Sequence, residues 1–115
     1  MPAGFASLYL EVYYQGRWIY VQPTIGGPCI HVRDGWSGEY ARRLQAHVRT
    51  NRGLPMDVTD EVKSRRPIDT KYEGYLTEEE MVTLSFDNVL SSLRKNSPYL
   101  RRVIYYWHPD YRDNN

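Results

Sequence analysis

The sequence predicts a small α+β domain: an antiparallel sheet, built from an N-terminal hairpin and a C-terminal strand, with two main helices packed on one face. Three observations lead to this prediction. Apolar residues alternate with polar ones in two N-terminal stretches, they recur at helical spacing in two later stretches, and a β-branched and aromatic run lies near the C-terminus. We expect residues 1–115 to form a single domain, with a frayed tail over about 109–115.

The N-terminal hairpin is predicted over residues 7–14 and 17–22. Every second residue from Leu8 to Val12 is aliphatic, so one face of the first strand is apolar. Gly16 lies between the two stretches and can supply the positive φ that a tight hairpin turn requires.

The middle of the chain is predicted to form a loop and then the first main helix. Residues 23–37 are rich in glycine and proline, with room for a short extended piece at 30–32. An apolar stripe predicts a helix over 37–52, and one or two further turns are expected within 57–63. The stripe consists of Tyr40, Leu44 and Val48.

The C-terminal half is predicted to contain a loop, the second main helix and the third strand. Residues 67–75 are polar and rich in turn formers, which indicates a loop. Thr77 and Glu80 are spaced as a capping box at the start of a helix that ends near Asn96. Residues 99–107 are β-branched and aromatic, which favours a strand over a helix.

Composition and charge exclude several classes of protein. The net charge of +1 indicates neither an acidic nucleic-acid mimic nor a dedicated basic nucleic-acid binder, although nucleic acid stays open as a partner. No apolar run approaches the ~20 residues of a membrane-spanning helix, and the N-terminus lacks the regions of a signal peptide. The single cysteine cannot form an intrachain disulfide, which fits a reducing cytosol. We therefore expect a cytoplasmic protein with no membrane partner.

Few residues are suited to catalysis or metal binding. Cys29 and His31 could act as nucleophile and base, because side chains two apart on an extended segment point the same way. Nothing in the sequence indicates a third, orienting group, and two ligands are too few for a zinc site. No Gly-x-Ser-x-Gly motif of a serine hydrolase occurs. We predict no catalytic residue, no metal site and no cofactor.

Tyrosine and arginine are the residues best suited to binding. The 11 tyrosines fit half-buried strands or a protein interface, where tyrosine is enriched. Residues 42–66 hold seven basic and three acidic side chains, which suits a phosphate or an acidic protein surface but equally a solvated helix face. Arg101 and Arg102 could extend this patch or occupy a sheet edge. The predicted contact residues are Arg42, Arg49, Arg52, Tyr13, Tyr20 and Tyr106.

Four segments resemble, in the same order, a family of uncharacterised proteins encoded by bacteriophages and prophages. Residues 52–62 are similar to the family's Arg-Gly-Leu-Pro-Asp-Asp-Val-Ser-x-Glu-Val, and residues 76–81 to its Leu-Thr-x-Glu-Glu-Leu helix start. Residues 16–18 match a Gly-Lys-Trp turn, and residues 102–107 match a closing strand. The chain lacks the family's Cys-Asp-x-His opening and its Asp-Gly-His-Ser-His segment, which are the groups suited to metal or acid–base chemistry.

The resemblance and the missing chemistry imply a phage accessory protein that binds and blocks a host protein. The expected target is an antiviral defence component, such as a CRISPR effector, in the cytosol of the bacterial host. Three alternatives stay open at this point: a sponge that sequesters a nucleotide signal, a virion or assembly component, and a small enzyme that uses Cys29 and His31.

Overall fold

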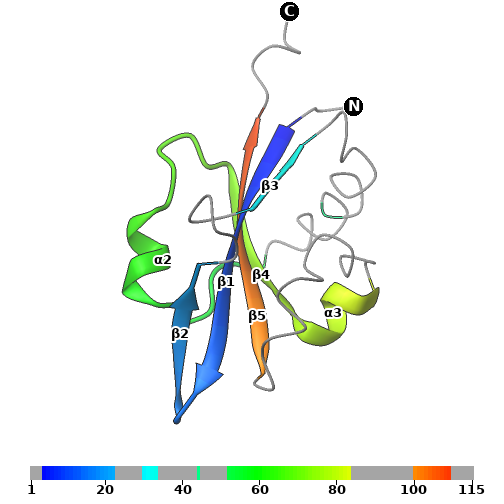
Figure 1. The fold of residues 1–115 in the computed structure, drawn as a ribbon. Helices are drawn as coiled ribbons and strands as arrows, with labels where there is room; N and C mark the ends of the chain where they lie inside the picture. Colours follow the sequence, from blue (N-terminus) through cyan, green and yellow to red (C-terminus); the bar gives the residue numbers. More distant parts are fainter. Residues whose placement is uncertain (1–3, 23–29, 34–43, 45–51, 84–99, 110–115) are drawn as a thin grey trace, which may run out of the picture.

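The fold is an antiparallel sheet with a short helix against each face (Figure 1). The computed structural model describes residues 4–22, 30–33, 44, 52–83 and 100–109. The described elements are β1 (Gly4–Tyr14), β2 (Arg17–Val21), β3 (Ile30–Arg33), α2 (Asp60–Ser64), β4 (Tyr72–Thr77), α3 (Glu78–Thr83) and β5 (Arg101–Pro109). These elements confirm the predicted α+β class.

The strands follow the order β2-β1-β5-β4, and β3 also pairs with β1. β2 pairs with the second half of β1 and β3 with its first half, so these two short strands share one edge of β1. β5 pairs along the whole opposite edge of β1, from Gly4↔Pro109 to Val12↔Arg101. The two long strands β1 and β5 therefore form the centre of the sheet.

The predicted N-terminal hairpin is confirmed, and β1 begins three residues earlier than expected. The register runs from Leu10↔Val21 to Tyr14↔Arg17. Gln15 and Gly16, with φ of 50° and 81°, both occupy the left-handed region. Two such residues are what a two-residue turn needs to match the twist of its strands. The predicted extended piece at 30–32 is also confirmed, as β3.

The C-terminal strand is confirmed as β5, but its place in the sheet corrects one prediction. Arg101 and Arg102 do not lie on a sheet edge, because β5 pairs with β1 on one side and with β4 on the other. Both arginines are buried, with 6% and 5% of their surface exposed. Arg101 forms an ion pair with Glu78 of α3. The predicted tail beyond Pro109 lies outside the described residues.

The loop predicted over residues 67–75 is wrong in its second half, where the chain forms the edge strand β4. Gly74 in the middle of this strand lowers its strand propensity. The glycine is required by packing, since an added Cβ would lie 2.6 Å from Cζ of the buried Tyr105 ring. The glycine that suggested a turn therefore serves a contact between residues that are distant in the sequence.

The two faces of the sheet carry separate hydrophobic clusters. The first cluster contains Ala6, Leu8, Leu10, Val12, Leu44, Leu76, Met81, Val103, Tyr105 and Trp107. The second cluster contains Tyr9, Val62, Ile104 and Tyr106. Met81 belongs to α3 and Val62 to α2, so the two helices lie against opposite faces of the sheet (Figure 1).

Short-range capping explains where both helices begin. The predicted capping box of α3 is confirmed: the Thr77 N–H donates to Glu80 Oε1 at 3.0 Å, and the Glu80 N–H donates to Thr77 Oγ1 at 3.2 Å. Thr59 caps α2 by accepting the Val62 N–H at 3.3 Å, which confirms the expected turns near 57–63.

Most of the two predicted main helices, at 37–52 and 77–96, lies outside the described residues. Leu44 and Arg52 are the described residues of the first. Leu44 is helical and fully buried and shares a cluster with Met81 of the second, whereas Arg52 is not helical. Within the described part of the chain, no helix has the length and apolar character needed to span a bilayer.

Candidate partner-binding site

A buried carboxylate on β1 organises the face of the sheet that α2 covers. Glu11 has no exposed surface. Its carboxylate accepts a hydrogen bond from Arg102 Nε at 2.6 Å and another from the Thr59 N–H at 2.8 Å. The charge is therefore paired and hydrogen-bonded, as a buried charge must be. The bond to Thr59 also fixes the start of α2 against the sheet.

Arg102 extends this network to the loop before α2. One of its terminal nitrogens donates to Asp57 Oδ1 at 2.7 Å, and the other donates to the Asp57 carbonyl at 3.0 Å. The hydrogen bond from Arg102 lowers the pKa of Asp57 below its usual value. The guanidinium carbon also lies 3.9 Å from the centroid of the Trp18 ring, on β2. Arg102 thus joins three separate segments of the chain.

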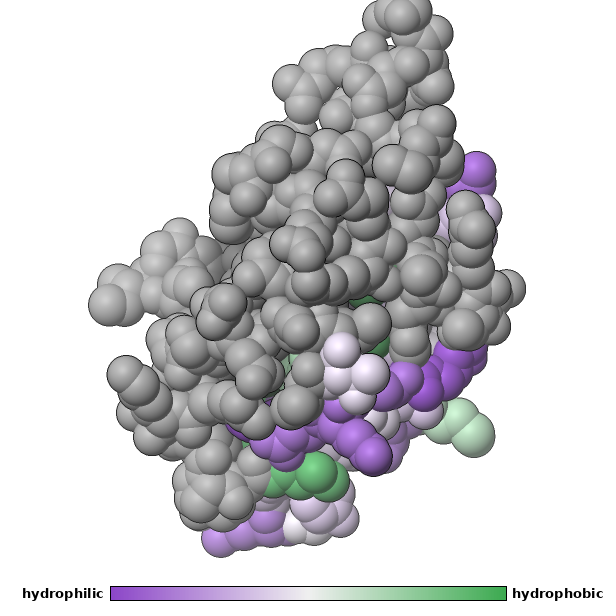
Figure 2. Space-filling model, turned by 90° about the vertical axis from the view of Figure 1, so that its right-hand side faces the viewer, coloured by the Kyte–Doolittle hydropathy of each residue, from purple (hydrophilic) through white to green (hydrophobic). Residues whose placement is uncertain are grey.

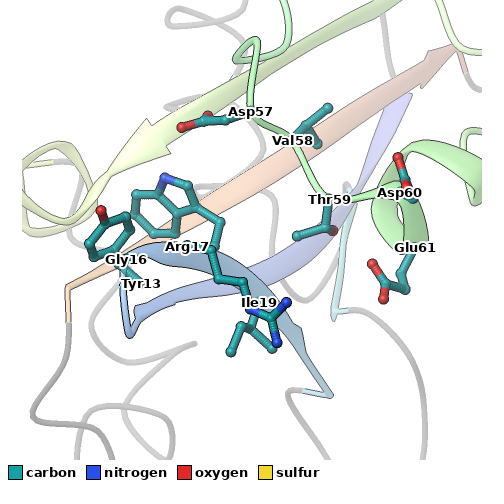
Figure 3. A pocket seen from close by; sticks show the side chains of 10 residues that line it. Tyr13, Gly16, Arg17, Ile19, Asp57, Val58, Thr59, Asp60 and Glu61 are labelled. Atoms are coloured by element: carbon teal, nitrogen blue, oxygen red, sulfur yellow. The ribbon is translucent and has the colours of Figure 1, made fainter.

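A pocket of about 500 Å³ lies between the β1–β2 hairpin and the loop that this network holds (Figure 3). Tyr13, Arg17 and Trp18 line it from the hairpin. Asp57, Asp60 and Glu61 are among the residues that line it from the opposite wall.

The pocket combines half-exposed aromatic rings with an acidic wall. Tyr13 is 41% exposed, and its ring meets Trp18 edge to face with centroids 5.2 Å apart. Its backbone N–H donates to the Leu100 carbonyl at 2.8 Å, which holds that end of the hairpin. Among the described residues, no ion pair or side-chain hydrogen bond engages the carboxylates of Asp60 and Glu61.

The side of the molecule that carries α3 shows few described side chains. Figure 2 views this side, and the described side chains visible there are mostly hydrophilic, with small separate hydrophobic areas. Within the described part of the chain, we take the aromatic pocket on the α2 side as the candidate binding site because of its lining.

The structure places the three predicted tyrosines in different environments. Tyr13 lines the pocket. Tyr20 is partly buried on β2, 6.3 Å from the ring of Tyr9 and with the Arg65 guanidinium 5.3 Å from its own ring. Tyr106 is fully buried and donates a hydrogen bond to the Val62 carbonyl at 2.8 Å. A side chain in the core cannot contact a partner. Tyr106 is therefore a core residue, and its prediction as a contact residue is wrong.

Arg52 is engaged within the fold. It donates to Glu80 Oε1 at 2.6 Å and to the Tyr75 carbonyl, and its guanidinium lies 4.0 Å from the centroid of the Tyr75 ring. Desolvation would raise the pKa of Glu80, but hydrogen bonds from Thr77 and Arg52 hold that pKa below its usual value. Arg52 therefore supports the capping box of α3.

Several other predicted residues cannot be placed at a site. Arg42, Arg49 and Cys29 lie outside the described residues, and only the backbone of His31 is described, on β3. In the described ranges, no group of three or more histidine, cysteine or acidic side chains is arranged to hold a metal ion.

Sequence reasoning missed a line of serine, histidine and aspartate at the other end of the sheet. Ser7 Oγ and His108 Nε2 are 3.3 Å apart, and His108 Nδ1 lies 3.1 Å from Asp69 Oδ1. The order of groups is that of a hydrolytic triad. Ser7, however, is only 3% exposed, within the central strand β1, whereas the Asp69 side chain is 43% exposed. A substrate cannot reach this hydroxyl. The hydrogen bonds of His108 with Ser7 and Asp69 instead hold the turn at 67–70 against the sheet.

Sequence reasoning also missed the pocket, although the Gly16–Trp18 and 52–62 segments contain most of its residues. Comparison with known proteins gives no match: none to a protein-family model, none to a curated protein and none to a solved structure.

Proposed function

We propose that the chain is a phage-encoded accessory protein that binds and blocks a host protein in the bacterial cytosol. The expected class of target is an antiviral defence component, such as a CRISPR effector. The phage origin is supported by the resemblance of residues 52–62 and 76–81 to phage and prophage proteins. The binding role is supported by the pocket beside the hairpin, which is the observation that carries the proposal.

The pocket has the properties of a protein-binding site. Interface hot spots are enriched in tyrosine, tryptophan and arginine that are held rigidly before the partner arrives. Trp18 contacts both the Arg102 guanidinium and the Tyr13 ring, and Tyr13 keeps 41% of its surface exposed. Met56, the residue before Asp57 in the sequence, is fully exposed, as suits an adaptable contact.

A binding role also fits the described chemistry better than the two ligand-directed alternatives. A nucleotide sponge needs cations free to meet phosphate, yet the pocket wall is acidic and Arg52 and Arg66 are paired with Glu80 and Glu73. The small enzyme predicted from the sequence would use Cys29 and His31, whose side chains lie outside the described part of the chain, and the buried Ser7 does not supply a substitute nucleophile that substrate can reach.

The proposal includes the helix packing predicted from the sequence. We propose that the helices over 37–52 and 77–96 pack together on the face opposite α2, because Leu44 and Met81 belong to one cluster there. In that arrangement α2 is, among the described elements, the helix that covers the face with the pocket.

The test is phage plating on a panel of bacterial strains, each of which carries one defence system and expresses this protein from a plasmid. We expect the protein to restore plating on at least one strain, and Tyr13→Ala to weaken that effect. Glu79→Ala, an exposed change on α3, is the matched control. If the protein restored plating on none of the strains, the result would count against the proposal. Full activity of Tyr13→Ala would do the same. Native mass spectrometry of the purified protein would then distinguish a bound host polypeptide from a homo-oligomer.

A further inference from the structure

We propose that the pocket beside the hairpin receives a basic side chain of the partner protein, arginine in preference to lysine. This inference deepens the proposed function and rests on it. It commits the site to one chemical class of contact, in which a guanidinium group enters between the ring pair Tyr13–Trp18 and the acidic wall formed by Asp57, Asp60 and Glu61.

The charges around the pocket favour a cation. Asp57, Asp60 and Glu61 line the pocket, whereas Arg17 is the cation among the described lining residues. Asp57 is already paired with Arg102 at 2.7 Å, whereas Asp60 and Glu61 have no ion-pair partner among the described residues, so these two carboxylates supply the uncompensated charge of the wall. In Figure 3 the side chains of Asp60 and Glu61 both come from the start of α2, on the side of the pocket opposite the hairpin. An incoming cation would gain from this wall.

The aromatic rings favour a guanidinium over other cations. The Trp18 ring already receives the guanidinium of Arg102 at 3.9 Å, so the indole in this site suits that planar group. Tyr13 extends the aromatic wall toward solvent. A guanidinium can stack on a ring and donate to a carboxylate in the same plane, whereas an ammonium is a more strongly hydrated point charge.

Other kinds of occupant fit this pocket poorly. A phosphate or a carboxylate would face the acidic wall, with Arg17 as the compensating cation among the described lining residues. An aliphatic side chain would take water from the carboxylates of Asp60 and Glu61 without replacing their hydrogen bonds, which costs free energy.

The test is a titration of the full chain labelled with 5-fluorotryptophan and followed by fluorine NMR. The probes are acetylated and amidated tri-arginine and its neutral isostere tri-citrulline. The three tryptophans give separate signals: Trp18 in the pocket, assigned with Trp18→Phe; the buried Trp107, which reports on folding; and Trp36. We expect tri-arginine to shift the Trp18 signal in a salt-dependent way, and tri-citrulline to leave it unchanged.

Charge-neutral variants then test the wall directly. Asp60→Asn combined with Glu61→Gln should weaken tri-arginine binding about 3- to 10-fold, because two carboxylates near the cation lose their charge. Arg17→Gln should strengthen binding by a similar factor, since it removes the competing cation. Glu79→Gln, the same chemical change on α3, should have no effect. An unchanged Trp107 signal in each variant shows that the sheet is intact.

The outcomes separate this inference from the proposed function. Equal responses to tri-arginine and tri-citrulline would overturn the basic side chain, as would a double variant at Asp60 and Glu61 that binds like the unmodified protein. If that double variant still restores phage plating, the proposed function stands and this inference fails. If tri-arginine binds as expected but the protein restores plating on no strain, the proposed function fails and the chemistry of the pocket stands.

Discussion

Replacing Arg102 by alanine should destabilise the fold by about 3–5 kcal/mol, because it leaves a buried carboxylate without its counter-charge. Glu11 has no exposed surface and lies on the central strand β1. It accepts two hydrogen bonds, from Arg102 Nε at 2.6 Å and from the Thr59 N–H at 2.8 Å. In Arg102→Ala only the second of these bonds remains.

Most of this cost arises at Glu11. The ion pair of Arg102 with Asp57 contributes little, since the Asp57 side chain is 65% exposed and water replaces the lost contact. Loss of the guanidinium over Trp18 adds about 0.5–2 kcal/mol, depending on how well that pair is shielded from water. Domains of this size are stable by about 5–15 kcal/mol, so the variant should fold but with a large part of its stability gone.

Urea unfolding followed by far-ultraviolet circular dichroism measures the effect, and a second variant tests the cause. Arg102→Leu with Glu11→Leu removes both buried charges together, so it should be more stable than Arg102→Leu alone. Glu11→Gln should cost less than Arg102→Ala, because an amide oxygen can still accept from the Thr59 N–H. A loss below about 1 kcal/mol in Arg102→Ala would refute the reasoning, as would a double variant whose loss equals the sum of the single losses.

Three further predictions concern β4, α3 and the tyrosines. Gly74→Ala should cost about 1–3 kcal/mol by overpacking against Tyr105, and an unchanged melting temperature would contradict this. Thr77→Ala should cost about 1 kcal/mol in urea unfolding by removing the N-cap, whereas Thr77→Ser should cost less. Burial raises the pKa of Tyr105 and Tyr106 to about 12, so stability should be complete below pH 10 and fall between pH 10 and 12. Tyr106→Phe should reduce that alkaline loss, and an identical pH profile would rule out the explanation.

The parts of the fold that could be predicted from the sequence depend on local signals. The hairpin follows from period-two alternation on both sides of Gln15-Gly16, whose backbone takes the left-handed conformation of the turn. The start of α3 follows from Thr77 and Glu80, which are three residues apart and bond to each other. In each case the residues that determine the structure are neighbours in the chain.

The parts that could not be predicted depend on partners far apart in the sequence. β4 pairs with β5, and Gly74 within it leaves room for the Tyr105 ring, more than thirty positions away. Alternation placed Glu11 and Tyr9 correctly on the face opposite the aliphatic residues, but α2 covers that face too, so both side chains are buried. The polar character of Glu11 gave no sign of burial, because its neutralisation comes from Arg102, 91 positions later.

The pocket was hidden for the same reason, and this links the stability of the protein to its proposed binding role. The Arg102 guanidinium that neutralises Glu11 also contacts Trp18 and Asp57, which are residues of the pocket. Arg102→Ala therefore leaves a space bordered by two carboxylates and an indole ring, which matches a free guanidinium ion.

Methylguanidinium should consequently restore part of the stability of Arg102→Ala, because a ligand that binds only the folded state raises its free energy of unfolding by RT ln(1 + [L]/Kd). At ten times the dissociation constant this gain is about 1.4 kcal/mol. Methylurea has a similar shape without the charge and should give no such gain. Methylguanidinium should stabilise the unmodified protein less than Arg102→Ala, because Arg102 itself fills this space and only the neighbouring pocket is left to bind the cation. Equal effects of the two compounds on Arg102→Ala would mean that shape rather than charge governs this site, and the cation preference inferred for the neighbouring pocket would lose its physical basis.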